Sequence, residues 1–119
     1  MVTIPLMQVK RYTSTNPNGT TVTAIVQGRS VGIRVRGAAT MGLATAENYA
    51  TVGTIKQIGD LLTKGQILKR IVITKGIFGQ LIITTDGVIR VGYTFDSAGA
   101  AVNIPEGMTF YIEESLVMQ

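Results

Sequence analysis

Hydrophobic and polar residues alternate along most of this chain, as expected of β-strands that bury one face. The clearest example is SVGIRVRG, in which Val31, Ile33 and Val35 fall on one face and Arg34 and Arg36 on the other. Comparable segments cover residues 2–12, 21–27, 51–58, 67–75, 78–85, 88–95 and 108–117, with a short VNI strand before the last. About eight strands separated by turn residues predict an all-β fold, an antiparallel β-sandwich of jelly-roll-like type.

The strongest local signal is QLIITTDGVIRVGYTF, two strand-like runs joined by Asp86 and Gly87. Asp-Gly is a preferred hairpin turn, so we interpret Asp86 as a turn former rather than as a functional carboxylate. Alternation in the second run places Tyr93 on the same face as Ile89 and Val91. This pattern predicts that Tyr93 packs in the core.

No shift in composition divides the chain, so residues 1–119 are predicted to form one domain. Within it, residues 1–20 form a candidate N-terminal attachment strand and turn. Residues 38–50 are rich in small side chains and are compatible with a short helix or a loop, of which we favour the loop. Residues 59–66 form a connection with room for one helical turn.

Composition narrows the chemistry available to the chain. Its 119 residues include no cysteine, which excludes disulfides and thiolate metal sites, and no histidine, the commonest general base. Glu113 and Glu114 are adjacent, so on a strand they point to opposite faces, while Asp60 and Asp96 sit at expected turns. We therefore predict a protein that is not an enzyme and uses no cofactor or metal. No run approaches the roughly 18 apolar residues that cross a bilayer, so no membrane insertion is predicted.

The charge balance is mildly basic, with 11 lysines and arginines against seven acidic residues and a net charge of +4. Arg34 and Arg36 share a strand face with Arg29 just before them, which suggests either a basic stripe for an acidic partner or ordinary solvent-side charge. We favour the second interpretation. A nucleic-acid-binding β-barrel that also uses Lys69 and Arg70 is kept as an alternative.

Two tyrosines are candidates for contact with an interface or a ligand. Tyr111 has the opposite strand parity to Phe110 and Ile112, so it is expected to be exposed. Tyr49 lies near the end of the small-residue segment at residues 38–50 and could stack on a sugar. Together with Arg34 and Arg36, these tyrosines form the set of candidate contact residues.

Several strands carry apolar residues on both faces. In residues 67–75, Ile71 and Ile73 share one face while Leu68 and Val72 lie on the other. A sandwich alone in water should show one polar face on each sheet. This excess predicts a second buried surface, most simply the subunit interface of a homo-oligomer.

The second half of the chain resembles the closing β-sandwich half of bacteriophage fibre proteins. The matching pieces are TDG at residues 85–87, IRV at 89–91, IPEG at 104–107 and TFYI at 109–112. The resemblance covers roughly residues 55–118 and implies a virion structural protein, typically trimeric, that is assembled in the host cytoplasm and packs against capsid or tail proteins. Its short length and Met1 favour a head fibre or capsid-decorating protein, like those of crAss-like phages, over a long-shafted tail fibre.

The resemblance also implies adhesion to a host-surface glycan through loops, but it transfers no binding residue. A tail-fibre or receptor-binding tip and a glycan-binding module therefore remain alternatives, beside the nucleic-acid-binding barrel. Steep weakening of binding with salt would favour nucleic acid. A stable oligomer would favour the virion hypothesis.

Overall fold

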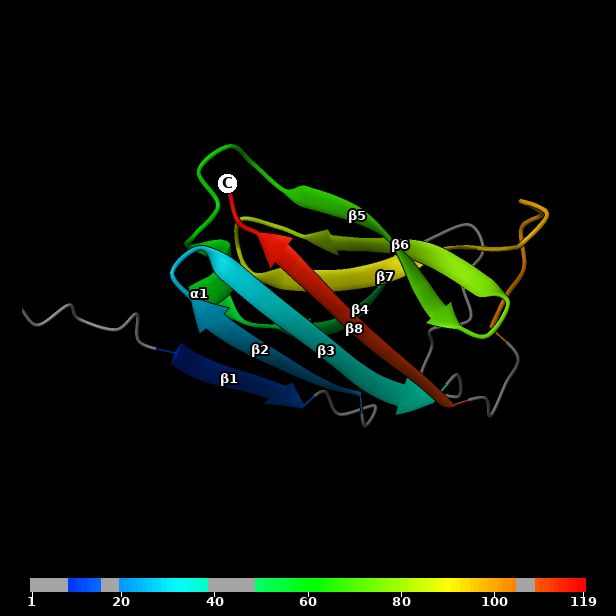
Figure 1. The fold of residues 1–119 in the computed structure, drawn as a ribbon, viewed down its shortest axis with the longest axis horizontal. Helices are drawn as coiled ribbons and strands as arrows, with labels where there is room; N and C mark the ends of the chain where they lie inside the picture. Colours follow the sequence, from blue (N-terminus) through cyan, green and yellow to red (C-terminus); the bar gives the residue numbers. More distant parts are fainter. Residues whose placement is uncertain (1–8, 16–19, 39–48, 105–108) are drawn as a thin grey trace, which may run out of the picture.

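A computed structural model describes residues 9–15, 20–38, 49–104 and 109–119. These residues form eight strands and one short helix (Figure 1). The elements are β1 (Val9–Thr15), β2 (Thr21–Gln27), β3 (Ser30–Ala38), β4 (Tyr49–Thr54), α1 (Lys56–Gly59), β5 (Ile67–Thr74), β6 (Ile77–Ile83), β7 (Val88–Asp96) and β8 (Thr109–Val117). The prediction of an all-β fold is confirmed.

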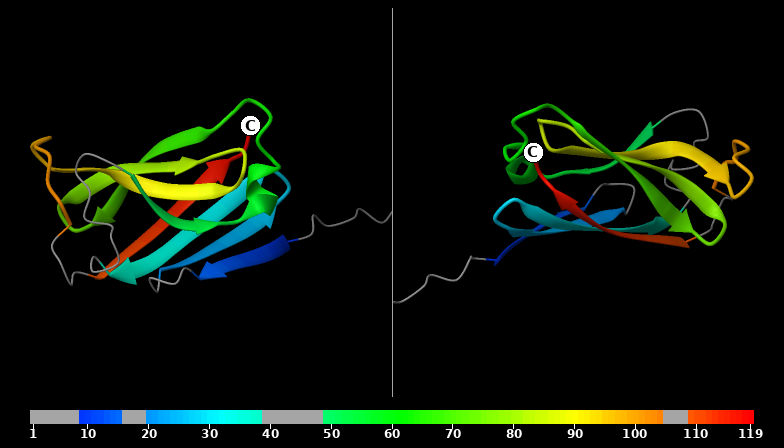
Figure 2. Two further views of the ribbon diagram at one scale, coloured as in Figure 1. Left: turned by 180° about the vertical axis from the view of Figure 1, so that it is seen from behind. Right: turned by 45° about the horizontal axis from the view of Figure 1, so that its top comes forward.

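The strands form two antiparallel sheets of four strands each. Sheet A has the order β1-β2-β3-β8, and sheet B has the order β4-β7-β6-β5. Figure 2 shows the two sheets as facing layers, with β5 against β8 at one side and β4 against β1 and β2 at the other. The arrangement is consistent with the predicted antiparallel β-sandwich.

The core lies between the two layers and is made of the inward-facing positions of both sheets. Alternation of the kind seen in the sequence selects them, since successive strand residues point to opposite faces. From sheet A they include Val22, Ala24, Val31, Ile33, Val35, Phe110, Ile112 and Leu116, and from sheet B Ile71, Ile73, Leu81, Ile83, Ile89 and Val91.

The segment predicted as a strand at residues 51–58 ends earlier, because β4 stops at Thr54 and α1 follows. Ile55, Ile58 and Leu62 are all buried, and a spacing of three and four residues brings side chains to one side of a helical turn. Tertiary burial of that apolar stripe thus overrides the strand-like composition. The helical turn expected in residues 59–66 therefore lies a few residues earlier. The VNI segment forms no strand, and only Ala101 makes an isolated bridge, to Phe95.

The prediction that Tyr93 packs in the core is wrong. Phe78 pairs with Phe95, yet Gln80 pairs with Gly92, so β7 carries one extra residue at this point. The irregularity is a β-bulge, which reverses the facing of the residues beyond it. Tyr93 has a φ of 49° and is 44% exposed, while Thr94 is 1% exposed and takes the inward position.

The Asp86-Gly87 turn joins β6 to β7 as predicted. Gly87 has a φ of 81° and donates its N–H to the Thr84 carbonyl at 2.9 Å. Its own carbonyl accepts the N–H of Ile55 at 2.9 Å, which docks the turn on the start of α1. The side-chain hydrogen bond among the described residues of this turn comes from Thr84 Oγ1, which accepts the Val88 N–H at 3.2 Å.

Four predictions fall wholly or partly outside the described residues. They concern the strand at residues 2–12 up to residue 8, the turn centred on 16–19, the small-residue segment at 39–48, and the IPEG motif from Pro105 onward. The described part of the first strand runs to Thr15, three residues beyond its predicted end. Within the described ranges, no helix has the length and hydrophobicity that a bilayer crossing requires.

Candidate functional site

The outer face of sheet A carries a cluster of arginine, threonine and tyrosine side chains, which we call the basic face. Strand register assembles it: Arg36 stands opposite Thr21 on β2 and Tyr111 on β8, and Arg34 stands opposite Thr23. These side chains and Arg11 from β1 line a hollow of about 220 Å³. All six residues come from strands of one sheet, so their backbones hold one another in place.

The basic face has more positive than negative charge. Arg34 Nε lies 3.5 Å from Glu113 Oε1, and both side chains are about half exposed. The guanidinium carbon of Arg36 lies 5.3 Å from the centroid of the Tyr111 ring, a cation–π contact. Among the residues that the structure describes, neither Arg11 nor Arg36 forms an ion pair. Of the three guanidinium groups, only that of Arg34 therefore has a carboxylate partner within the described residues.

A second hollow, of about 380 Å³, lies on the same outer face. Gly32 leaves it open, because a Cβ built there would meet only the Ile25 carbonyl oxygen, at 4.0 Å. Its rim includes Val117, and Arg34 lines both hollows. The basic face is therefore continuous with a second, larger depression that also has apolar side chains in its lining.

The outer face of sheet B is different, and we call it the apolar face. It is formed by Leu68, Val72, Phe78, Ile82, Tyr93 and Phe95. Leu68 pairs with Ile82 across β5 and β6, and Phe78 pairs with Phe95 across β6 and β7. The two phenylalanine rings stack with centroids 5.8 Å apart. These hydrophobic side chains lie on a surface that faces away from the core, in two groups separated by the Arg70–Gln80 pair, and the exposed Arg90 stands opposite Ile82.

Tyr49 lies at the β4 side of the apolar face. Its hydroxyl donates a hydrogen bond of 2.6 Å to Gln80 Oε1, and its ring meets Tyr93 edge-on with centroids 4.5 Å apart. Burial raises the pKa of Tyr49 above its ordinary 10.0, and the neighbouring Tyr93 adds to the increase. The phenol is therefore protonated at neutral pH and acts as a hydrogen-bond donor.

The structure brings together three of the four candidate contact residues. Arg34, Arg36 and Tyr111 meet on the basic face, whereas Tyr49 lies on the opposite layer. Sequence reasoning missed Arg11, Thr21 and Thr23. Their outward parity was readable from alternation, but their closeness to the arginines depends on strand register, which the sequence does not reveal.

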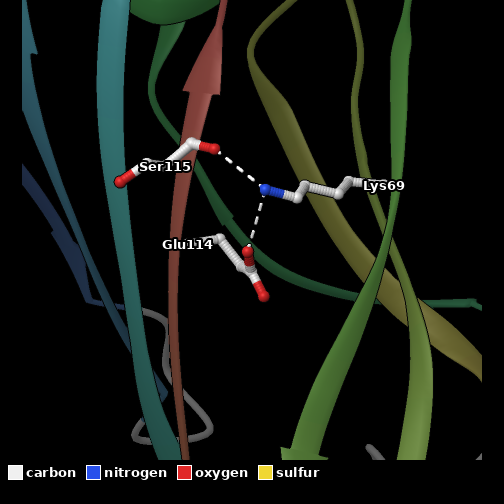
Figure 3. Close-up of polar contacts among 3 residues, drawn as sticks. All are labelled: Lys69, Glu114 and Ser115. Atoms are coloured by element: carbon white, nitrogen blue, oxygen red, sulfur yellow. Dashed lines mark hydrogen bonds and ion pairs between the residues drawn. The ribbon is translucent and has the colours of Figure 1, made fainter.

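The residues proposed for nucleic-acid binding are separated in space. Arg29 donates from Nε to the Met118 carbonyl at 2.8 Å and from its terminal nitrogen to the Leu61 carbonyl. Lys69 points toward sheet A, where Nζ contacts Glu114 and the Ser115 carbonyl (Figure 3). Arg70 lies on the apolar side, 5.8 Å from the Phe95 ring centroid. The described strands also form two separate sheets rather than one closed barrel.

Among the described residues, no three potential ligands from carboxylates, histidine or cysteine lie close enough to hold a metal ion. No family model, curated protein or solved structure matches this chain. Its candidate function therefore rests on the two faces of the sandwich and on the resemblance noted in its sequence.

Proposed function

We propose that this chain is a virion structural protein, a head fibre or capsid-decorating module that assembles as a homo-oligomer, a trimer as the fibre resemblance implies, through the apolar face. One observation carries the proposal: beside Arg70, Gln80 and Arg90, the outer face of sheet B exposes the large hydrophobic side chains of Leu68, Val72 and Tyr93, where an isolated antiparallel sheet would be polar. The virion setting comes from the fibre-like motifs of the second half. Of these motifs, the TDG turn and the IRV segment lie at the β6–β7 hairpin next to the apolar face.

The exposed side chains of the apolar face favour burial against a partner. Leu68 is 52% exposed, Val72 is 54% exposed and Tyr93 is 44% exposed. Burying the exposed half of such a side chain contributes on the order of 1 kcal/mol. Ile82 is only 6% exposed although it faces outward, between Leu68 and Arg90 in the strand register.

We assign a second copy of this chain as the occupant of the apolar face. Neighbouring strands lie about 4.8 Å apart and residues rise about 3.3 Å, so four strands of about seven residues cover on the order of 400 Å². That area is the whole outer face, and exposed apolar side chains grouped on such a face often mark a contact site. The guanidinium carbon of Arg70 lies 5.8 Å from the centroid of the Phe95 ring, so this face also carries a positive charge in contact with an aromatic side chain. Closed homo-oligomers are the commonest assemblies of soluble proteins.

The test is the oligomeric state, measured by light scattering coupled to size-exclusion chromatography. We expect the wild type to be a discrete oligomer and the double variant Leu68→Glu, Val72→Glu to be a folded monomer. Val117→Glu is the matched control, because Val117 is 59% exposed but lies on sheet A. A wild type that is monomeric at all accessible concentrations would contradict the proposal, as would dissociation by Val117→Glu alone.

The virion setting is tested separately, by the position of the gene. We expect capsid, portal or tail genes beside it. If the neighbouring genes encode a metabolic pathway instead, the virion assignment is wrong. That result would not bear on assembly through the apolar face, which the oligomeric state tests separately.

A further inference from the structure

We propose that the hollow on the basic face binds the carboxylate or sulfate group of an acidic saccharide. The site is lined by Arg11, Thr21, Thr23, Arg34, Arg36 and Tyr111. It lies on sheet A, on the opposite side of the sandwich from the apolar face. The inference therefore stands independently of the proposed assembly, and either can fail alone.

Uncompensated arginines are the first argument for an oxyanion ligand. The planar guanidinium presents paired N–H donors that match carboxylate and sulfate oxygens. Arg11 and Arg36 form no ion pair within the described residues, and Arg34 has a long contact of 3.5 Å to Glu113. A bound oxyanion would therefore give these three guanidinium groups a close negatively charged partner.

Threonine hydroxyls are the second argument, and they favour a sugar as the carrier of the anion. Thr21 and Thr23 occupy successive outward positions of β2 and are partly buried. A hydroxyl both donates and accepts hydrogen bonds, so it can pair with sugar hydroxyls in either direction. Thr21 is paired with Arg36 and Thr23 with Arg34 between two inner strands of the sheet. Because the paired strands hold these side chains in place, less conformational entropy is lost when a ligand binds them.

The size of the hollow argues against a nucleic-acid strand. Its volume of about 220 Å³ is below the range of about 300–1,000 Å³ typical of pockets for drug-sized ligands. A hollow of this volume has room for one charged sugar unit, while the adjoining units of the saccharide lie outside it. Single-stranded nucleic acid needs successive aromatic platforms, whereas Tyr111 is the one aromatic ring of this lining and already contacts Arg36.

Glu113 supplies a sharp test, because it competes with the ligand for Arg34. Replacing it with glutamine removes the competing charge and keeps the shape of the side chain. An exposed ion pair is worth up to about 1 kcal/mol, so Glu113→Gln should tighten anion binding by up to about fivefold. A gain of affinity is a result that damage to the fold would not produce.

The experiment is isothermal titration calorimetry at fixed ionic strength with a uronic-acid oligosaccharide, a sulfated oligosaccharide, the neutral parent oligosaccharide, inorganic sulfate and single-stranded DNA. We expect an acidic oligosaccharide to bind more tightly than the neutral parent and more tightly than inorganic sulfate. Arg36→Gln should weaken that binding about tenfold or more, since hydrogen bonds to charged groups are worth about 1.5–3 kcal/mol. Thr23→Val should weaken it by a smaller factor.

Lys75→Gln is the matched charge control, because Lys75 is an exposed residue in the turn between β5 and β6 of the other sheet. It should leave the affinity unchanged. Equal affinity for neutral and acidic oligosaccharides would overturn the proposal, as would equal losses in Arg36→Gln and Lys75→Gln. Tighter binding of DNA than of either acidic oligosaccharide, with steep salt dependence, would replace the saccharide by nucleic acid.

Discussion

Lys69 Nζ on β5 lies 3.0 Å from Glu114 Oε2 on β8, so one ion pair connects the two sheets at the edge of the sandwich (Figure 3). The same ammonium donates to the Ser115 carbonyl at 2.9 Å. Lys69 shares the inward parity of Ile71 and Ile73, yet its head reaches the polar rim of the core. Its alkyl chain therefore crosses between the sheets while its charge remains hydrated.

We predict that Lys69→Met lowers the free energy of unfolding by about 0.5–1 kcal/mol, because methionine keeps the alkyl contact and removes a partly exposed pair. Urea denaturation measures the change. A double-mutant cycle with Glu114→Gln should give a coupling energy of similar size that decreases in high salt. No coupling in low salt would show that the pair does not stabilise the fold.

Asp86 and Gly87 contribute differently to the stability of the turn that they form, and the sequence alone does not distinguish their contributions. Gly87 has a φ of 81°, and a Cβ there would lie 2.2 Å from the Ile55 carbonyl oxygen. We expect Gly87→Ala to destabilise the protein by roughly 3 kcal/mol or more, since strain and a backbone clash combine. Asp86→Ala should stay within about 0.5 kcal/mol, because Asp86 is exposed and Thr84 holds the turn.

Thermal and urea denaturation of both variants distinguish these contributions. A large loss in Asp86→Ala with a small one in Gly87→Ala would reverse the interpretation of the turn.

Thr94 occupies the inward position created by the bulge in β7. Its hydroxyl donates to the Val102 carbonyl, and its own carbonyl accepts the Val102 N–H at 3.1 Å. We predict that Thr94→Val lowers stability by about 1–2 kcal/mol, because the partly buried carbonyl of Val102 loses the hydroxyl that donates to it. Thr94→Ser, which keeps the hydroxyl, should be the milder substitution in the same denaturation assay.

Tyr49 predicts a specific response to alkaline pH. Its pKa is raised in the folded state, mainly by burial and further by Tyr93. The stabilising contribution of the neutral phenol is therefore fully present below the unfolded pKa of 10.0 and is lost as pH rises through the folded pKa. Absorbance of the phenolate should show one tyrosine titrating later than the others, and Tyr49→Phe should abolish that late phase.

The hydrogen bond from Tyr49 to Gln80 adds a second expectation at neutral pH. Tyr49→Phe should lower stability by about 1 kcal/mol, with Gln80 left free to meet solvent. If the late phase persisted in Tyr49→Phe, the raised pKa would belong to another tyrosine.

Much of the architecture could be predicted from local patterns. The apolar-rich residues 21–27 form β2 with the expected limits, and residues 30–37, which alternate cleanly, lie in β3 with Arg34 and Arg36 outward. Leu68 and Val72 face away from the core as their parity predicted. In each case one buried face imposes a period of two on the sequence, so the pattern records the structure.

The exceptions arise where the regular period is broken. One extra residue in β7 turns Tyr93 outward and Thr94 inward. The local sequence YTF, residues 93–95, contains no signal that predicts this bulge. Residues 56–59 adopt a helical turn because Ile58 finds a buried site there, not because of helix propensity. Tertiary packing outweighs local preference at both positions.

By itself, the sequence determined the fold class, most strand positions, the Asp-Gly turn and the excess of apolar residues on two faces. These properties depend on spacing within one segment, where backbone geometry links residue parity to facing. Only the tertiary structure decided that Arg11, Thr21 and Thr23 join Arg34, Arg36 and Tyr111 in one hollow, while Tyr49 stands on the opposite layer. Such groupings depend on which strands pair and in which register, and those choices are made by the packing of the whole core.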